Sequence, residues 1–432
     1  MSRRSRIPAV LLFTAAILIT PFAKAEDLLD VHVQAIQHDP QLRSAKAAFE
    51  AVLEERVQAR ALLRPSVTTG AGLVREWADD GSKGAGNQYH LTLSQPLYLR
   101  EACIQAGQAD SRIARAEAEL EKVGQELRLR VSTAYFEVLT MLDNLELIRA
   151  ERLAVSRQLE LVQQRFSVGF STIIEIHEAQ ARHDLTLAAE IAAEDQLANS
   201  REVLREITGL YHENLAGLGD ELPLVDPDPA VVDPWVETAL QRNQQLAALR
   251  HEMEMVRLEA SRRQAARYPR LSAIASYRDG NRSSDFETDS AGRTQIGIQL
   301  DAQLYQGGRI SSQVRQARSL HVQTREKLEE ARRAVEREVR SAFFGVMAKV
   351  SHVKALQQAH RSSEMALEAT RAGFEAGTRT VLEVLDSQRE LYRTRRDYTR
   401  ARHEYLLETL RLKKAAGTIQ DSDLQGINSM LR

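Results

Sequence analysis

Two carboxylates near the end of the chain are spaced so that they could act together. Glu383 and Asp386 are three residues apart, so on a helix their side chains project from one face. Acidic groups gathered around a narrow axis concentrate negative potential and favour cations, whereas most pairs with this spacing lie on an ordinary solvated helix surface. The elements that carry the pair therefore decide which of these two interpretations holds.

The segment that carries the pair has a copy earlier in the chain. Residues 165–180 (RFSVGFSTIIEIHEAQ) align with residues 373–388 (GFEAGTRTVLEVLDSQ), and five positions match: Phe166 with Phe374, Gly169 with Gly377, Thr172 with Thr380, Glu175 with Glu383 and Gln180 with Gln388. In both copies a glycine separates two runs of apolar residues with helical periodicity, which predicts a helix that stops and restarts. Each half of the chain should therefore turn a helical hairpin here, as one unit of an internal repeat.

Both repeats are expected to contain the same elements in the same order. Repeat one (26–220) has an opening helix over about 28–63, a β-hairpin over 65–98, a long helix over 104–168 and a return helix over 172–208. Repeat two (235–416) has an opening helix over about 235–267, a β-hairpin over 269–305, a long helix over 310–375 and a return helix over 380–416. A proline-rich connector (221–234) joins them, and a polar tail (417–432) follows. Pro65 and Pro269 end the opening helices, because proline lacks an amide proton and clashes with the preceding turn.

The predicted strands alternate between larger apolar and small or polar residues. Val67 to Leu73 and Ile296 to Leu304 show the pattern most clearly. Alternation over about ten residues, with polar loops over 78–88 and 278–294, is typical of membrane-spanning β-hairpins, although a soluble antiparallel sheet would look the same. Aromatic residues suited to the two bilayer interfaces lie at the strand ends: Trp77, Tyr89 and Tyr277 near the loops, Tyr98 and Tyr305 at the opposite ends.

Four strands are too few to close a barrel, and an open edge is not tolerated in lipid. Because known barrels have eight or more strands, the chain should pool its strands with copies of itself, and a homotrimer with twelve strands is the economical solution. The long helices carry apolar residues at alternating steps of three and four, as in a coiled coil. From Gln105 to Ser167 such a helix would be about 95 Å long.

Composition and the N-terminus restrict the remaining possibilities. The chain has 432 residues and a formal charge of −2, which gives no basic excess for nucleic acid. Its one cysteine, Cys103, excludes an intramolecular disulfide framework and is expected to be buried. Residues 1–25 have the basic start, apolar core and small-x-small end of a secretory signal peptide. No cysteine follows the cleavage site, so no lipid anchor is expected.

The doubled tip and the doubled strand pair resemble the TolC family of outer-membrane channels over almost all of the mature chain. The residues that carry the resemblance are the turn at 305–308 (YQGG), the helix end at 204–209 (LREITG) and residues 377–386 (GTRTVLEVLD). The resemblance implies an α+β membrane protein: a trimeric twelve-stranded antiparallel β-barrel, four strands per chain, that continues into a long α-helical coiled-coil periplasmic tunnel. It implies an outer-membrane exit duct for tripartite drug efflux or type I protein secretion in a Gram-negative bacterium. Its partners would be outer-membrane lipid, a periplasmic adaptor (membrane fusion) protein, and an inner-membrane pump of the RND, ABC or MFS type or a secretion ATPase.

The same resemblance assigns roles at the two tips. Glu383 and Asp386 match the family's periplasmic entrance constriction, with glutamate at 383 where well-known members carry aspartate. Arg379 and Glu175 match a latch that ties neighbouring hairpins together in the closed state. Phe374 and Ile174 stand where many members have latch hydroxyls, so packing should replace some hydrogen bonds. The docking surface for the adaptor would comprise Gly169, Phe170, Ser171, Gly377 and Thr378.

Three other classes of protein fit less well. An enzyme is unlikely on sequence grounds, because the eleven histidines are scattered and no metalloprotease, serine-hydrolase or phosphate-loop motif is present; no cofactor and no metal site are expected. A periplasmic adaptor would have one helical hairpin rather than two. A trimeric adhesin would share the coiled coil but lack the doubled order of strands, helix, tip and helix.

Overall fold

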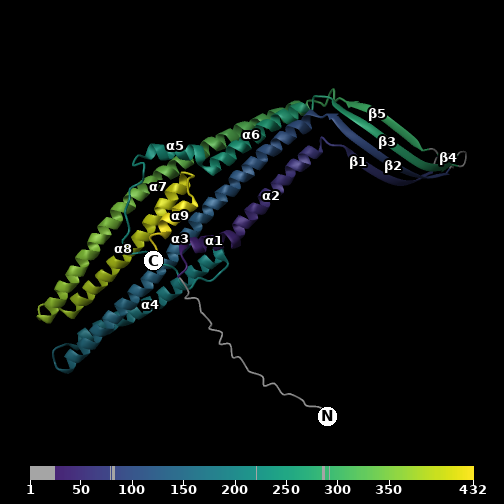
Figure 1. Cartoon of the computed structure of the whole chain (residues 1–432). Coiled ribbons are helices and arrows are strands. Elements are labelled where there is room, and N and C mark those ends of the chain that lie inside the picture. Colours follow the sequence, from purple (N-terminus) through teal and green to yellow (C-terminus); the bar gives the residue numbers. More distant parts are fainter. Residues whose placement is uncertain (1–24, 78, 80–82, 220, 285–287, 291) are drawn as a thin grey trace, which may run out of the picture.

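The protein is a long rod, with a β-sheet at one end and two helical hairpin tips at the other (Figure 1). The structure is a computed structural model and describes residues 25–77, 79, 83–219, 221–284, 288–290 and 292–432. The predicted signal peptide, residues 1–25, lies outside the described residues except for Ala25. The helices therefore separate the sheet from the tips by most of the length of the molecule.

Four long antiparallel strands form the sheet in the order β1 (Ser66–Trp77), β2 (Lys83–Tyr98), β3 (Arg270–Ser284) and β5 (Arg293–Asp301). A short strand, β4 (Thr288–Ser290), pairs with the far end of β3. The register places apolar partners opposite one another, as in Val67 with Leu93, Leu93 with Ala275 and Ala275 with Ile296. Since directly paired residues share a face, one face of the sheet is apolar, and its side chains are exposed in the single chain.

The strands extend further from the helices than the sequence indicated. β2 begins at Lys83 and β3 ends at Ser284, within ranges predicted to be loops. The prediction failed because these extensions are rich in glycine and polar residues, whose backbones pair without an apolar alternation. Tyr89 and Tyr277 consequently lie within the strands, paired with Ala71 and Leu91 respectively, and not near the loops as expected.

Trp77 ends β1, Tyr98 ends β2, and Tyr305 lies just past β5. All five aromatic side chains are exposed. Their role as membrane-interface anchors stays a prediction.

Two very long helices connect the sheet to the tips: α3 (Arg100–Ser167) and α7 (Arg309–Glu375), of 68 and 67 residues. The halves of α3 and α7 nearest the tips pair with the return helices α4 (Ile173–Thr208) and α8 (Val381–Ala415). The halves nearest the sheet pack against α2 (Pro40–Ala61) and α6 (Gln244–Ala265). The two hairpins also contact each other, through α8 on α3 and on α4.

Each opening helix is broken into two, which the sequence analysis did not predict. α1 (Leu28–His38) ends at Asp39, whose carboxylate accepts a hydrogen bond from the Leu42 backbone N–H (2.8 Å) at the start of α2. Pro40 occupies the first turn of α2, where its missing N–H costs nothing. α5 (Val232–Arg242) and α6 meet in the same way at Asn243, whose side chain caps α6. The apolar periodicity continues across both breaks, so the pattern alone did not reveal them.

The main hydrophobic core lies at the level of these breaks, and the C-terminal tail is part of it. The tail forms α9 (Asp421–Asn428), and its Leu424 and Ile427 are buried in that core. The backbone of Arg432 exchanges hydrogen bonds with Gly217. The tail, which was expected to be polar, therefore supplies core residues. The connector is held at the same level, where Tyr405 Oη contacts both the N–H and the carbonyl of Val225 at 3.0 Å.

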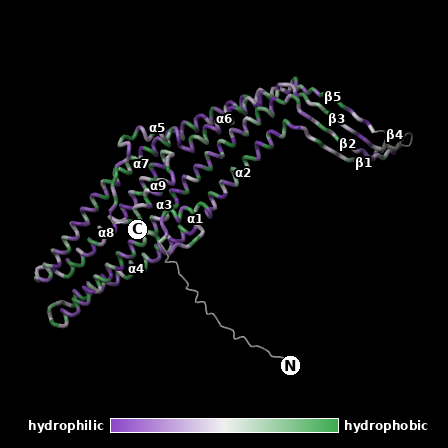
Figure 2. Tube along the Cα trace, viewed as in Figure 1, coloured by the Kyte–Doolittle hydropathy of each residue, from purple (hydrophilic) through white to green (hydrophobic). Residues whose placement is uncertain are grey.

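Hydrophilic and hydrophobic residues alternate along every helix (Figure 2). None of the described helices contains a stretch long and apolar enough to cross a membrane. Cys103, expected to be buried, is exposed in the first turn of α3, because that turn lies at the junction with the sheet.

Candidate functional site at the hairpin tips

The two hairpin tips are built from the same local interactions. α3 ends at Ser167 and α7 at Glu375, and a glycine with positive φ follows two residues later in each: Gly169 (+84°) and Gly377 (+75°). These left-handed values favour glycine, since other residues would be strained there. Thr172 and Thr380 then cap α4 and α8, and each cap is completed by a glutamate three residues later. In each tip the glycine thus follows the end of the first helix, and a reciprocal capping box begins the second, as the sequence predicted.

In the first tip, Glu175 is held within its own hairpin. Its Oε2 accepts hydrogen bonds from the Ser171 hydroxyl (2.5 Å) and the Thr172 N–H (2.7 Å). These bonds, that from Ser171 foremost, lower the pKa of Glu175, so it stays ionised near neutral pH. Ser171, predicted to contact an adaptor, thereby also supports the cap.

The second tip holds Glu383 in the same way and adds a cation. Glu383 Oε2 accepts from the Thr380 N–H (2.7 Å), and Oε1 accepts from Arg379 Nη1 (2.6 Å). The hydrogen bond from Thr380 and then that from Arg379 lower the pKa of Glu383. Glu383 is therefore an ionised carboxylate whose direction is fixed by the cap.

Asp386 points to the other hairpin. Its Oδ1 lies 2.9 Å from Arg182 Nη2 on α4 and 3.8 Å from Arg389 Nη2 on its own helix. The sequence placed Glu383 and Asp386 on one face, but it gave no sign of Arg182, because a contact between hairpins depends on how their helices are aligned. Arg182 is thus a site residue that the sequence analysis missed.

The structure does not bring Arg379 to Glu175 within one chain, since each is bound inside its own tip. A link between copies of the chain stays a prediction. Instead, Arg165 at the end of α3 lies over the ring of Phe374 at the end of α7. Phe374 is also nearly buried in a small apolar cluster that draws residues from both hairpins, as expected if packing replaces a hydroxyl. Ile174 is exposed and takes no part in this contact.

The first tip exposes apolar side chains that no element in the described part of the chain covers. Phe170 is 82% exposed, and Val168, Ile173 and Ile174 are exposed beside it. In the second tip the position that matches Phe170 is occupied by the polar Thr378. A group of exposed apolar side chains on a turn is typical of interaction surfaces, so docking at this tip stays a prediction.

A polar cluster around the buried His403 also lies between the hairpins, closer to the core. The Thr140 hydroxyl donates to the Phe136 carbonyl (2.7 Å), so it accepts from His403 Nδ1 (2.8 Å). His403 Nε2 then faces Asp143 Oδ2 at 3.7 Å with a lone pair. Burial, followed by the nearby Glu146, raises the pKa of Asp143 to about 6, and burial lowers that of His403 to about 4. This contact between α3 and α8 thus favours a neutral histidine beside a carboxyl that gains a proton easily.

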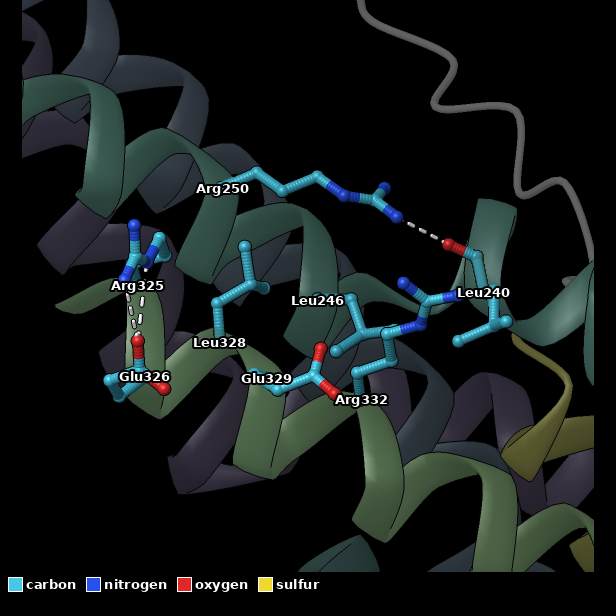
Figure 3. Close-up of a pocket in the computed structure, with 8 residues that line it drawn as sticks. All are labelled: Leu240, Leu246, Arg250, Arg325, Glu326, Leu328, Glu329 and Arg332. Carbon is cyan, nitrogen blue, oxygen red and sulfur yellow. Dashed lines mark hydrogen bonds and ion pairs between the residues drawn. The ribbon is translucent and has the colours of Figure 1, made fainter. Parts of the chain in front are cut away.

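A groove between α6 and α7 has an apolar floor of Leu240, Leu246 and Leu328 (Figure 3). Its rim carries charges that are satisfied locally: Arg325 bonds Glu326 at 2.9 Å, and Arg250 donates to the Leu240 carbonyl at the end of α5. Among the residues that line it, no nucleophile lies beside a base. Among the described residues, no three side chains of the metal-binding types cluster closely enough to hold an ion.

Comparison with known proteins decides the family. The model of the family described as outer membrane efflux protein matches residues 31–210 and 235–418. The chain belongs to this family. It is 36% identical to the outer membrane protein TolC of Vibrio cholerae serotype O1 over 94% of each chain. It is 32% identical to TolC of Escherichia coli over 95% of this chain and 86% of that protein.

Solved structures show the same fold. A structure of CusC has a TM-score of 0.80 at 16% identity and covers 90% of this chain and 92% of its own. The outer membrane protein VceC from Vibrio cholerae has a TM-score of 0.77 at 19% identity, with 90% and 96% covered. The α+β channel-tunnel fold predicted from the repeat is therefore confirmed. The protein is a channel of the outer membrane of a Gram-negative bacterium, of the efflux and type I secretion class, and its helical part extends into the periplasm.

Proposed function

We propose that three copies of this chain form a passive exit duct that is gated at its periplasmic tip. The observation that carries the proposal is the sheet: one face is apolar and exposed, and the outer strands β1 and β5 each pair with a single neighbour. Ile296, Leu300 and Leu304 on or just beyond β5 are all more than half exposed. An open edge and a bare apolar face are both unstable alone, and pairing β1 of one copy with β5 of the next would remove the edges.

The tips supply the gate in this proposal. Around a threefold axis, Glu383 and Asp386 would form a ring of carboxylates that favours cations and resists compression. Arg379 would act at the same level, either on Glu383 as within the chain or on Glu175 of a neighbouring copy. The capped, ionised state of Glu383 supports this assignment.

We further infer that the tips dock a periplasmic adaptor, which recruits an inner-membrane pump of the RND, ABC or MFS type or a secretion ATPase. The exposed Phe170, flanked by Gly169 and Ser171, is the apolar part of the expected contact, and Gly377 and Thr378 form the polar part. Relatives of this chain include "Alkaline protease secretion protein AprF" and "Pyoverdine export outer membrane protein OpmQ", so both proteins and small molecules are candidate cargo classes.

Fractionation and electrophoresis test the assembly. The protein should be recovered with the outer membrane, and it should migrate as a trimer that heating in SDS converts to a monomer. A compact monomer with no affinity for detergent would refute the proposal.

The gate and the docking surface are tested with variants of the assembled channel. Arg379→Gln should raise single-channel conductance in planar bilayers; a channel equally tight without Arg379 would assign closure to the packing of Phe374.

Phe170→Ser should reduce co-purification with the inner-membrane partner. Val225 is an exposed apolar residue in the connector, and Val225→Ser should leave co-purification unchanged. Equal recovery of the partner with both variants would remove Phe170 from the docking surface.

A further inference from the structure

Asp386 is restrained by a residue of the opposite hairpin. The Arg182 guanidinium on α4 lies 2.9 Å from Asp386 Oδ1 on α8, and the Arg182 side chain is only 18% exposed, whereas that of Asp386 is 49% exposed. This contact crosses from the α3–α4 hairpin to the α7–α8 hairpin. A carboxylate bound in this way is turned toward the neighbouring hairpin and partly neutralised, so it contributes less to the potential of an open axis than an unpaired one.

A second carboxylate stands near Arg182 without a direct partner. Glu151 on α3 is 8% exposed. It makes no hydrogen bond or ion pair with any part of the chain that the structure describes. Burial raises its pKa, while Arg396, Arg182 and Arg389 act against that rise. A buried carboxylate in this position is an acceptor that gains from any cation able to reach it.

Arg182 therefore acts on two carboxylates of different hairpins: it lies 2.9 Å from Asp386, and its charge opposes the rise in the pKa of Glu151. Asp386 is on α8 and would leave with the α7–α8 hairpin, whereas Glu151 is on α3 and stays with α4, the helix that carries Arg182. The long, flexible arginine side chain allows one guanidinium to serve either carboxylate. Separation of the hairpins would therefore carry Asp386 away from Arg182 and leave Glu151 in place.

We propose that Arg182 is a positioning residue of the gate, which holds Asp386 against the first hairpin at rest and transfers to Glu151 when the hairpins separate. This inference rests on the proposed function. The transfer has two consequences. It frees the Asp386 carboxylate to face the axis as the gate opens. It also gives the buried Glu151 carboxylate a cationic partner, and the lack of that partner makes the resting state less stable. The channel would thus be more cation-selective when open than when closed.

Single-channel recording of the trimer in planar bilayers tests the exchange. Arg182→Gln should raise the open probability about threefold to tenfold, as expected for losing a partly exposed ion pair in each of three subunits. It should also shift the reversal potential of the resting channel toward higher cation selectivity, a readout that a merely structural role would not move. Arg182→Lys should restore most of the wild-type behaviour, because it keeps the charge.

Glu151→Gln tests the second acceptor. It should lower the open probability while leaving the resting selectivity unchanged, and this effect should vanish in a background that already carries Arg182→Gln. Arg393→Gln is the matched control, because Arg393 lies on α8 and pairs with Glu390 and Asp397 of the same helix; it should not change the open probability.

The outcomes separate this inference from the proposed function. If the variants form heat-sensitive trimers that conduct, but Arg182→Gln and Glu151→Gln both behave as wild type, the exchange is wrong and the duct stands. If Glu151→Gln lowers opening equally with and without Arg182, Glu151 acts independently and the transfer is also wrong. A wild-type protein that forms no trimer and carries no current instead refutes the duct itself.

Discussion

Arg165 lies over the ring of Phe374 with its guanidinium carbon 4.4 Å from the ring centre, and this contact joins the end of α3 to the end of α7. A cation over an aromatic face contributes about 0.5–1 kcal/mol at an exposed site. The two residues belong to different hairpins, so the contact holds the tips at one spacing.

Replacing the Phe374 ring should loosen the tips. Phe374→Leu keeps an apolar side chain in the cluster but removes the ring, and the open probability in planar bilayers should rise about twofold to fivefold. Phe374→Tyr keeps the ring and is the matched control, with a channel as closed as wild type. If the leucine variant is equally closed, the ring does not hold the tips.

The charge and the capping role of Glu383 can be separated. Glu383→Gln keeps a side chain able to cap α8 but removes the charge, so we expect lower cation selectivity with an unchanged tip. Glu383→Ala should lower selectivity to the same extent and also weaken the cap of α8, because it removes the acceptor of the Thr380 N–H. Combining Glu383→Ala with Asp386→Ala should reduce selectivity further.

Glu175→Gln is the control for the ring of carboxylates. Glu175 completes the same capping box in the first tip, but it is not assigned to the constriction. Reversal potentials should therefore be unchanged in this variant. A loss of selectivity as large as that of Glu383→Gln would contradict the assignment of the ring to the second tip.

Stability should depend on pH through Asp143. Its pKa of about 6 in the folded protein lies above the ordinary value, so the folded state binds the proton more tightly than the unfolded state. The resulting stabilisation is complete below the unfolded pKa, near 4, and is lost as pH rises through 6. His403, with its pKa lowered to about 4, acts in the opposite direction, because its contribution is lost as pH falls through 4.

The Asp143 contribution is isolated by comparing wild type with Asp143→Asn. The variant should dissociate and unfold at a higher temperature than wild type at pH 7.5, and the difference should shrink toward pH 5. Melting curves at several pH values measure this. A constant difference across the range would show that Asp143 does not titrate between these values.

The tail should contribute to the stability of the core. Leu424 is fully buried in α9, so Leu424→Ala should cost about 2–5 kcal/mol by loss of burial and creation of a cavity. Gln425→Ala alters an exposed neighbour on the same helix and should have almost no effect. Equal melting temperatures for the two variants would show that α9 is not part of the cooperative core.

The repeat made much of the fold predictable. Two hairpin tips were predicted from residues close in sequence, and the structure has both. In each tip a glycine (Gly169 or Gly377) is followed three residues later by threonine and six residues later by glutamate. Strand alternation likewise identified the apolar face of the sheet. These features depend on neighbours in sequence, which a single chain displays directly.

What the sequence did not reveal depends on contacts between distant segments. The break between α1 and α2 depends on the Asp39 cap and on an ion pair between Asp39 and Arg130 of α3 at 2.8 Å. The apolar periodicity continues across the break and therefore does not indicate it. Arg182 and Asp386 are in contact because α4 and α8, which belong to different hairpins, lie side by side at that level of the fold. Within one chain Arg379 bonds Glu383 one turn away, a local partner that the resemblance did not suggest, and the link from Arg379 to Glu175 stays a prediction.

The breaks at Asp39 and Asn243 have a mechanical consequence. Among the described helices, α3 and α7 alone run unbroken from the tips to the sheet, so a load applied at either tip is carried directly along these two helices. Each hairpin is fixed at one end by the core around Leu424 and is free at its tip. A small tilt of the helices at the core therefore moves the tip by a larger distance. A modest lateral push by a partner would therefore move the tips far without disturbing the strands.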